Sequence, residues 1–272
     1  MNERTPVSEM SVMILCGGQG TRIREASESL PKPLIDIGGQ PILWHILKTY
    51  GQYGFRHFIL CLGYKGWDIK RYFLQYRENV ADFSLQLNSE RTVSFHDGLG
   101  EEGWEITFAE TGLSTATGAR IRRARQYIRG DTFMMTYGDG VGSVDIPALL
   151  EFHREQGRTG TVTGVHPSSR YGELAVDPGR RVVEFNEKPT VATGWVSGGY
   201  FVFQREFADR YLDDDPSLYL EQQPLQQLAH DGELAMFPHE GFWMGMDTYR
   251  DYLLLNQLWD AGDPPWRTWK EG

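Results

Sequence analysis

The stretch SVMILCGGQGTR, residues 11–22, decides the fold, because a buried apolar run passes directly into a loop with three glycines. Gly17, Gly18 and Gly20 let backbone N–H groups approach a ligand closely. Loops of this kind after a strand bind phosphate oxygens. The spacing excludes the two commonest types, since a dinucleotide fingerprint needs glycine at Ile23 and no Gly-Lys-Ser/Thr of a P-loop follows. The alternative is a tight turn without a ligand.

Two cations follow the loop and favour the phosphate interpretation. Arg22 offers a planar pair of donors for phosphate, and Lys32 offers a mobile point charge. Pro31 and Pro33 restrict the backbone on both sides of Lys32. The alternative for each cation is an ordinary surface ion pair.

Outward from this stretch, strand-like and helix-like segments alternate. The strand-like runs are residues 11–16, 57–62 and 131–137, and the helical patterns are residues 41–54, 67–79 and 119–128. Buried strands separated by helices predict a Rossmann-like three-layer α/β/α fold with a mainly parallel sheet. Ligands bind such sheets beyond the carboxyl ends of the strands.

The length of 272 residues suits a single domain, residues 1–272. Residues 80–110 contain alternating patterns and turn residues, which predict a small β-rich insertion. Residues 240–272 predict a C-terminal helix and tail.

Composition limits the classes of partner. A net charge of −10 argues against nucleic acid. The longest apolar run near the start is too short for a secretory or membrane segment. Cys16 and Cys61 both lie in apolar runs, so we expect buried free thiols and a cytoplasmic location.

The combination G-G-x-G-T-R with P-K-P resembles the sugar-1-phosphate nucleotidyltransferases. The segments CLGYKG, TATGARIRR, TYGDGV, FNEKP, GELAMFPHEGFW and PPWRTW are similar to those of the glucose-1-phosphate cytidylyltransferases. The resemblance runs from about residue 11 to the end. It implies that CTP and a sugar 1-phosphate react by direct displacement at the α-phosphorus. The products would be a CDP-sugar and pyrophosphate.

The resemblance also implies roles for individual residues. Arg22 would hold the leaving phosphates, and Lys32 would contact the α-phosphate where charge develops. The nucleotide would further contact Leu15, Gly17, Gly18, Gly20, Thr21, Thr117, Gly118, Arg120 and Asp139. The sugar phosphate would contact Gly172, Glu173, Glu187, Lys188, Ser197, Gly198 and Gly199. The alternative for Arg120 is a helix surface residue, and for the glycines it is turn geometry.

A magnesium ion is expected on two carboxylates. Asp139 follows the apolar run 131–137, so it would lie at the carboxyl end of a strand. Hard divalent ions prefer carboxylate oxygens. Asp247 matches the second carboxylate of the resembled family. Its alternative is the N-cap of the helical pattern that follows.

Two positions depart from the pattern of the resembled family. Glu173 stands where those enzymes carry a small residue, and Ser197 stands where they carry asparagine. A buried carboxylate needs a partner, and serine cannot offer the two hydrogen bonds of an amide. Two interpretations stay open: glucose 1-phosphate is the acceptor, or the acceptor is another phosphate that carries more donors.

The sequence argues against two other classes of protein. A glycosyltransferase often carries an Asp-x-Asp motif, which Asp139-Gly140-Val141 lacks. A non-catalytic relative would have lost Arg22, Lys32 or the metal carboxylates. The insertion and the aromatic tail are typical of oligomer contacts in the resembled family, and we expect a homo-oligomer, a trimer or hexamer.

Overall fold

The computed structural model describes residues 5–18, 30–87, 92–96, 103–166, 173–176, 180–186 and 194–270. Seven strands of the described chain form the central sheet, in the order β14-β10-β13-β8-β1-β4-β7. They are β1 (Ser11–Leu15), β4 (His57–Leu62), β7 (Glu105–Glu110), β8 (Thr132–Tyr137), β10 (Gly160–Val165), β13 (Val196–Gln204) and β14 (Leu234–His239). Within this sheet β13 runs antiparallel to β8 and β10, and the other pairs are parallel. The mainly parallel sheet is confirmed.

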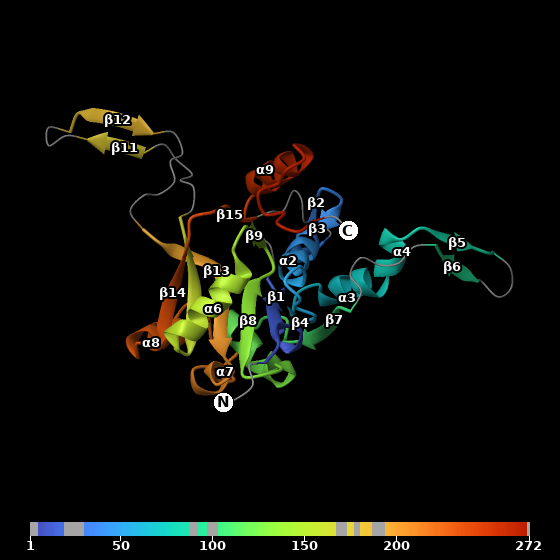
Figure 1. Ribbon diagram of the computed structural model, residues 1–272, viewed down its shortest axis with the longest axis horizontal. Coiled ribbons are helices and arrows are strands. Elements are labelled where there is room, and N and C mark those ends of the chain that lie inside the picture. The colour runs from blue at the N-terminus through green and yellow to red at the C-terminus, as the bar shows by residue number, and fades with distance from the viewer. Residues whose placement is uncertain are drawn as a thin grey trace.

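Helices cover both faces of the sheet, as the alternation along β1 requires. Val12 and Ile14 pack on one face with α2 (Ile42–Gly51), α6 (Ile146–Gln156) and α9 (Tyr249–Asp260). Met13 and Leu15 pack on the other face with α5 (Thr117–Ala124), α7 (Phe207–Arg210) and α8 (Gln223–His230). The two buried clusters are the two cores of a three-layer α/β/α fold (Figure 1).

The second predicted helix and the predicted insertion differ from the expectation. The helix is split at Gln75 into α3 (Gly66–Leu74) and α4 (Tyr76–Val80). The stretch 80–110 is not one insertion. Strands β5 (Phe83–Leu85) and β6 (Val93–Phe95) form an antiparallel hairpin that projects beyond α4, whereas β7 pairs with β4 in the central sheet (Figure 1). Hydrophobic alternation alone does not distinguish a hairpin strand from an edge strand of the sheet.

Short elements complete the chain. Strand β9 (Gly140–Gly142) pairs with β15 (Trp243–Gly245), β2 (Asp36–Ile37) with β3 (Gln40–Pro41), and β11 (Glu173–Val176) with β12 (Val182–Asn186). The 3-10 helices are η1 (Val7–Glu9), η2 (Lys32–Leu34) and η3 (Arg125–Tyr127). Cys16 and Cys61 are buried free thiols, as predicted. Among the described residues, no helix has the length and apolar character needed to cross a membrane.

Candidate active site

A cavity of about 510 Å³ lies at the carboxyl ends of β1 and β8. This volume is in the range of small-molecule sites, and the position is the one that parallel sheets favour. Its walls come from residues 15–18, 113–117 and 137–139, together with the start of η2. Seven residues expected at the site line it: Leu15, Gly17, Gly18, Lys32, Thr117, Arg120 and Asp139.

Three of the predicted glycines have distinct surroundings. A Cβ atom at Gly17 would lie 2.2 Å from Cζ of Arg120, so only glycine fits there. At Gly18 no heavy atom lies within 4 Å of that position, so its backbone is open. At Gly118 a Cβ atom would lie 2.9 Å from the carbonyl oxygen of Leu218. Gly17 and Gly118 are therefore needed for packing, whereas Gly18 has room for a ligand.

Arg120 organises the loops around the cavity. Its side chain is buried, so the helix-surface alternative is wrong. Nη1 donates to the carbonyl oxygens of Leu62 and Gly112, both at 2.9 Å, and Nη2 donates to that of Gly17 at 3.3 Å. These bonds tie the end of β4 to the glycine loop. Contact of Arg120 with a nucleotide stays a prediction.

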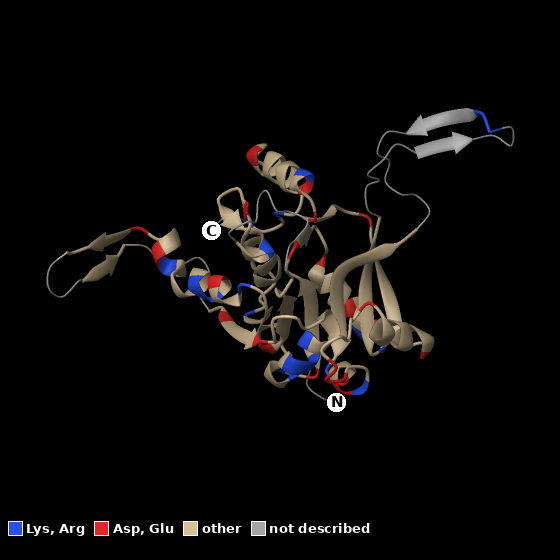
Figure 2. Ribbon diagram, turned by 180° about the vertical axis from the view of Figure 1, so that it is seen from behind, with Lys and Arg blue, Asp and Glu red and all other residues tan. Residues whose placement is uncertain are grey.

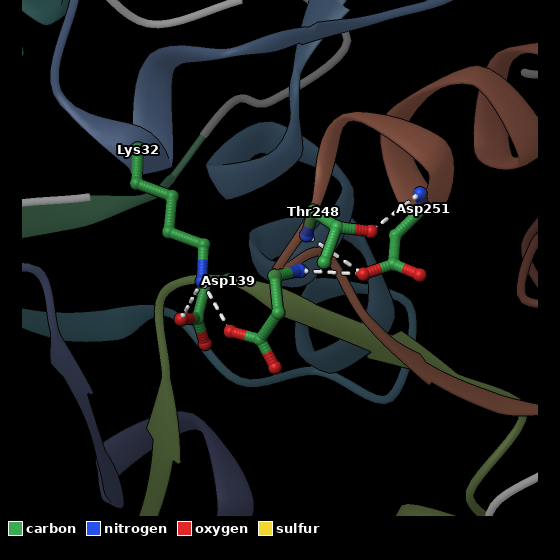
Figure 3. A network of polar contacts seen from close by, with 5 residues as sticks. Lys32, Asp139, Thr248 and Asp251 are labelled. Carbon is green, nitrogen blue, oxygen red and sulfur yellow. Dashed lines mark hydrogen bonds and ion pairs between the residues drawn. The ribbon is translucent and has the colours of Figure 1, made fainter. Parts of the chain in front are cut away.

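Lys32 joins the two carboxylates that were predicted to bind metal. Its Nζ lies 2.7 Å from Oδ2 of Asp139 and 2.9 Å from Oδ1 of Asp247 (Figure 3). Burial alone would lower the pKa of Lys32, but the attraction of Asp139 and then of Asp247 raises it overall. The Lys32 side chain is 12% exposed, whereas those of Asp139 and Asp247 are 38% and 42% exposed. The carboxylates therefore remain accessible to a ligand.

The backbone brings these carboxylates together from distant parts of the chain. Gly140 pairs with Gly245 in the β9–β15 ladder, and the N–H of Met246 donates to the carbonyl oxygen of Asp139 at 2.8 Å. Both carboxylates thus lie at the same end of this ladder.

Thr248, not Asp247, is the N-cap of α9, so the N-cap alternative for Asp247 is wrong. Thr248 Oγ1 accepts from the N–H of Asp251 at 3.3 Å. Oδ2 of Asp251 accepts from the N–H of Thr248 at 2.8 Å and from that of Asp247 at 3.0 Å (Figure 3). This capping box leaves the side chain of Asp247 directed toward Lys32.

The donor set fits a divalent metal that keeps waters and substrate oxygens. Asp139 and Asp247 converge on one positive atom, which shows that a single cation can contact both. No group of three or more His, Cys, Asp or Glu side chains that could hold a metal occurs in the part of the chain that the structure describes. Mg²⁺ uses few protein carboxylates and completes its shell with water and phosphate, which agrees with two ligands.

Two of the three glycines predicted for the sugar, Gly198 and Gly199, lie near the start of β13, next to aromatic side chains. Gly199 has φ +76°, and a Cβ atom there would lie 2.6 Å from Cδ2 of Tyr137. The indole N–H of Trp243 donates to the carbonyl oxygen of Gly198 at 2.6 Å. Ser197 is exposed, and its Oγ accepts from the N–H of Gly199 at 3.4 Å. Contact of these residues with a sugar stays a prediction.

The backbone of Glu173 lies in β11 opposite Asn186, and its contact with a sugar phosphate stays a prediction. The residues Gly20, Thr21, Arg22, Gly172, Glu187 and Lys188 lie outside the described residues. Their roles remain those that the resemblance implies.

The sequence interpretation missed two aromatic residues of the cavity and one carboxylate behind it. Tyr137 and Tyr219 line the cavity. Tyr137 directly precedes Gly138 and Asp139 at the end of β8, a position that could have indicated it. Glu221 accepts hydrogen bonds from Tyr137 and Thr117, and no local pattern marks it.

The chain matches the family model described as nucleotidyl transferase over residues 11–260. It belongs to the nucleotidyl transferase family. The glucose-1-phosphate cytidylyltransferase of Salmonella typhi is 42% identical over 262 residues, which cover 96% of this chain and 100% of the relative. The probable glucose-1-phosphate cytidylyltransferase of Bacillus subtilis is 44% identical over 261 residues, with the same coverage.

Solved structures support the fold. A putative glucose-1-phosphate thymidylyltransferase from Bacillus anthracis superposes with a TM-score of 0.67 and 15% identity over 97% of both chains. HddC from Yersinia pseudotuberculosis, solved with GMP-PN, superposes with a TM-score of 0.66 and 22% identity over 92% of this chain and 99% of that chain. These likenesses agree with the Rossmann-like fold of the chain.

Proposed function

We propose that this enzyme condenses CTP with glucose 1-phosphate to give CDP-glucose and pyrophosphate. The observation that carries the proposal is that Lys32 and Asp139 line one cavity with the open backbone at Gly18, and that Asp247 converges with Asp139 on the Lys32 ammonium. Full-length relatives at 42% and 44% identity, which are named for this reaction, support the choice of both substrates.

The chemistry needs positioning and neutralisation of charge rather than a protein nucleophile. An oxygen of the sugar phosphate attacks the α-phosphorus, a new P–O bond forms, and the bond to pyrophosphate breaks. Lys32 would stabilise the charge on the α-phosphate, and Arg22 would hold the leaving pyrophosphate. Mg²⁺ held by Asp139 and Asp247 would neutralise charge on the triphosphate. Glu187 and Lys188 would orient the sugar phosphate.

A pyrophosphate-release assay with CTP and glucose 1-phosphate tests the reaction. We expect turnover with Mg²⁺ and none in excess EDTA. A panel of CTP, UTP and dTTP tests the base, and faster turnover of UTP or dTTP would overturn the choice of CTP. No pyrophosphate release with any of these nucleotides would argue for a glycosyltransferase or a non-catalytic relative.

The acceptor needs its own measurement, because Glu173 and Ser197 differ from the pattern of the resembled family. We expect glucose 1-phosphate to give the highest kcat/KM among sugar 1-phosphates. If an amino-bearing acceptor phosphate were better by orders of magnitude, the hydrogen bonds of the sugar site would be matched to it instead.

We also propose that the enzyme lies in the reducing cytoplasm, where its two free thiols would stay reduced. We further propose that it forms a homo-oligomer through the β5–β6 hairpin. Figure 2 shows no charged residue on these two strands. Phe83, Leu85 and Val93 are exposed by 40%, 40% and 44%. An isolated hairpin is marginally stable, and exposed apolar side chains mark contact surfaces. Light scattering at micromolar concentration should give a trimer or hexamer, and a monomer would contradict it.

A further inference from the structure

Residues 216–221 form hydrogen bonds with the start of α5, where Ala116 and Thr117 line the cavity. The N–H of Ala116 donates to the carbonyl oxygen of Pro216 at 2.8 Å, and that of Gly118 donates to the carbonyl oxygen of Leu218 at 2.9 Å. Thr117 Oγ1 accepts from the N–H of Leu220 at 2.9 Å. The first turn of α5 is thus held by protein groups, so its position depends on residues 216–221.

Glu221, in the same segment, also connects α5 with the wall of the cavity that Tyr137 forms. Its Oε2 accepts from Thr117 Oγ1 at 2.7 Å, and its Oε1 accepts from the hydroxyl of Tyr137. Thr117 and Tyr137 both line the cavity, one from α5 and the other from β8. One carboxylate therefore joins two walls that come from different elements.

Tyr137 extends the connection toward the catalytic cluster and the sugar side. It lies two residues before Asp139, and its ring occupies the space beside Gly199. A rotation of this ring would change the nucleotide wall and the surroundings of Gly199 together.

We propose that Glu221 is a positioning residue, which holds the Thr117 wall and the Tyr137 wall at the separation that the bound nucleotide requires. The proposal deepens the proposed function, on which its kinetic part rests. A carboxylate suits this role because each of its two oxygens accepts one hydroxyl, whereas an amide accepts at only one atom. Hydrogen bonds to charged groups are also stronger than neutral ones.

The test compares Glu221→Gln, Glu221→Ala and Tyr137→Phe with the matched control Glu233→Gln. Like Glu221, Glu233 accepts two hydrogen bonds, in its case both from Thr159 at 2.9 Å. It directly precedes β14, at the amino end of that strand. The first readout is CTP affinity by calorimetry without an acceptor. The second readout is steady-state kinetics, which shows whether a variant changes kcat or the KM values of the two substrates.

We expect Glu221→Ala to weaken CTP binding by about tenfold or more, in line with the loss of charged hydrogen bonds. Both KM values should rise, Glu221→Gln should restore part of the affinity, and Glu233→Gln should match the wild type. The double variant Glu221→Gln/Tyr137→Phe should be no worse than the weaker single variant, because the two residues act through one bond.

Values within twofold of wild type for all three Glu221 and Tyr137 variants would overturn the proposal. It would also be overturned if CTP affinity fell only in proportion to a lowered unfolding midpoint. Glu221→Gln and Tyr137→Phe preserve volume, so they carry the test if Glu221→Ala does not fold. Wild-type protein that neither binds nor turns over CTP would instead overturn the proposed function, and the same binding series would then use the nucleotide that does bind.

Discussion

Two polar clusters of this molecule differ in charge: one is charged and partly exposed, and the other is neutral and buried. At the cavity, Lys32 keeps its charge between Asp139 and Asp247, and both carboxylates remain partly exposed. In a cluster beside the C-terminal tail, the imidazole of His45 from α2 is fully buried, and its Nε2 donates to the carbonyl oxygen of Ile37 at 2.9 Å. Burial lowers the pKa of His45 to about 4. Its ring contacts Trp259, Trp266 and Trp269.

The difference separates function from stability. At the cavity, the charges lie where water and ligand can reach them. In the tail cluster, His45 stays neutral because the cost of burying its charged form exceeds the gain from its hydrogen bond to Ile37. Changes at the cavity should therefore alter catalysis with little effect on folding, and changes at the tail cluster should do the reverse. The predictions below test this separation, from the largest expected effect to the smallest.

Replacement of Asp139 or Asp247 by alanine should lower kcat by about 10⁴-fold or more, because the metal would lose half of its protein carboxylates. The measurement is pyrophosphate release at saturating Mg²⁺, beside circular dichroism to verify the fold. Asp209→Asn is the control, since Asp209 is an exposed carboxylate in α7 that pairs with Arg122. A kcat above a hundredth of wild type for Asp139→Ala would exclude the metal role.

Replacement of Trp266 by alanine should lower the free energy of unfolding by about 3–5 kcal/mol, because the fully buried indole would leave a cavity. The kcat measured well below the unfolding midpoint should stay close to wild type. Chemical denaturation gives the stability, and Trp67→Ala is the control, since Trp67 is 63% exposed. A large loss of kcat in the folded variant would show that the tail cluster is not separate from the site.

Replacement of Lys32 by methionine should raise the barrier of the chemical step by about 3–4 kcal/mol, comparable to the loss of one preorganised donor. Stability should change less than activity, although the two carboxylates would then lack their shared cation. Single-turnover kinetics measures the step. Lys48→Met is the control, since Lys48 lies over the ring of Trp44 at 5.3 Å. Retention of more than a tenth of wild-type kcat would contradict the role.

Acidification should destabilise the protein through its buried histidines. Burial lowers the pKa values of His45 and His153 from 6.5 to about 4. Between these values the unfolded chain binds protons that the folded chain does not, so stability falls as the pH falls from 6.5 toward 4. The loss approaches about 3 kcal/mol per histidine. His153→Gln should give a shallower pH profile in urea denaturation, and an unchanged profile would contradict the assignment.

The sequence by itself determined the central strands and much of the cavity. The runs at 11–16, 57–62 and 131–137 became β1, β4 and β8 within one residue at each end, because continuous apolar runs identify strands buried on both faces. Gly17 and Gly18 were predicted because a glycine-rich loop follows an apolar run, and Asp139 because it follows another apolar run of a parallel sheet. Lys32 was predicted from its place between two prolines and from the family resemblance.

Tertiary structure alone decided the roles that depend on distant partners. For Arg120 the sequence left a nucleotide contact and a helix surface position open, and the fold buries its side chain among the carbonyl oxygens of Leu62, Gly112 and Gly17. Asp247 does not cap α9, because Thr248 and Asp251 form the capping box. Glu221 lies 104 residues from Thr117 and 84 from Tyr137 along the chain, and only the tertiary fold brings the three residues into contact. Local patterns record which face a residue buries, but hydrogen-bond partners across the fold depend on three-dimensional geometry.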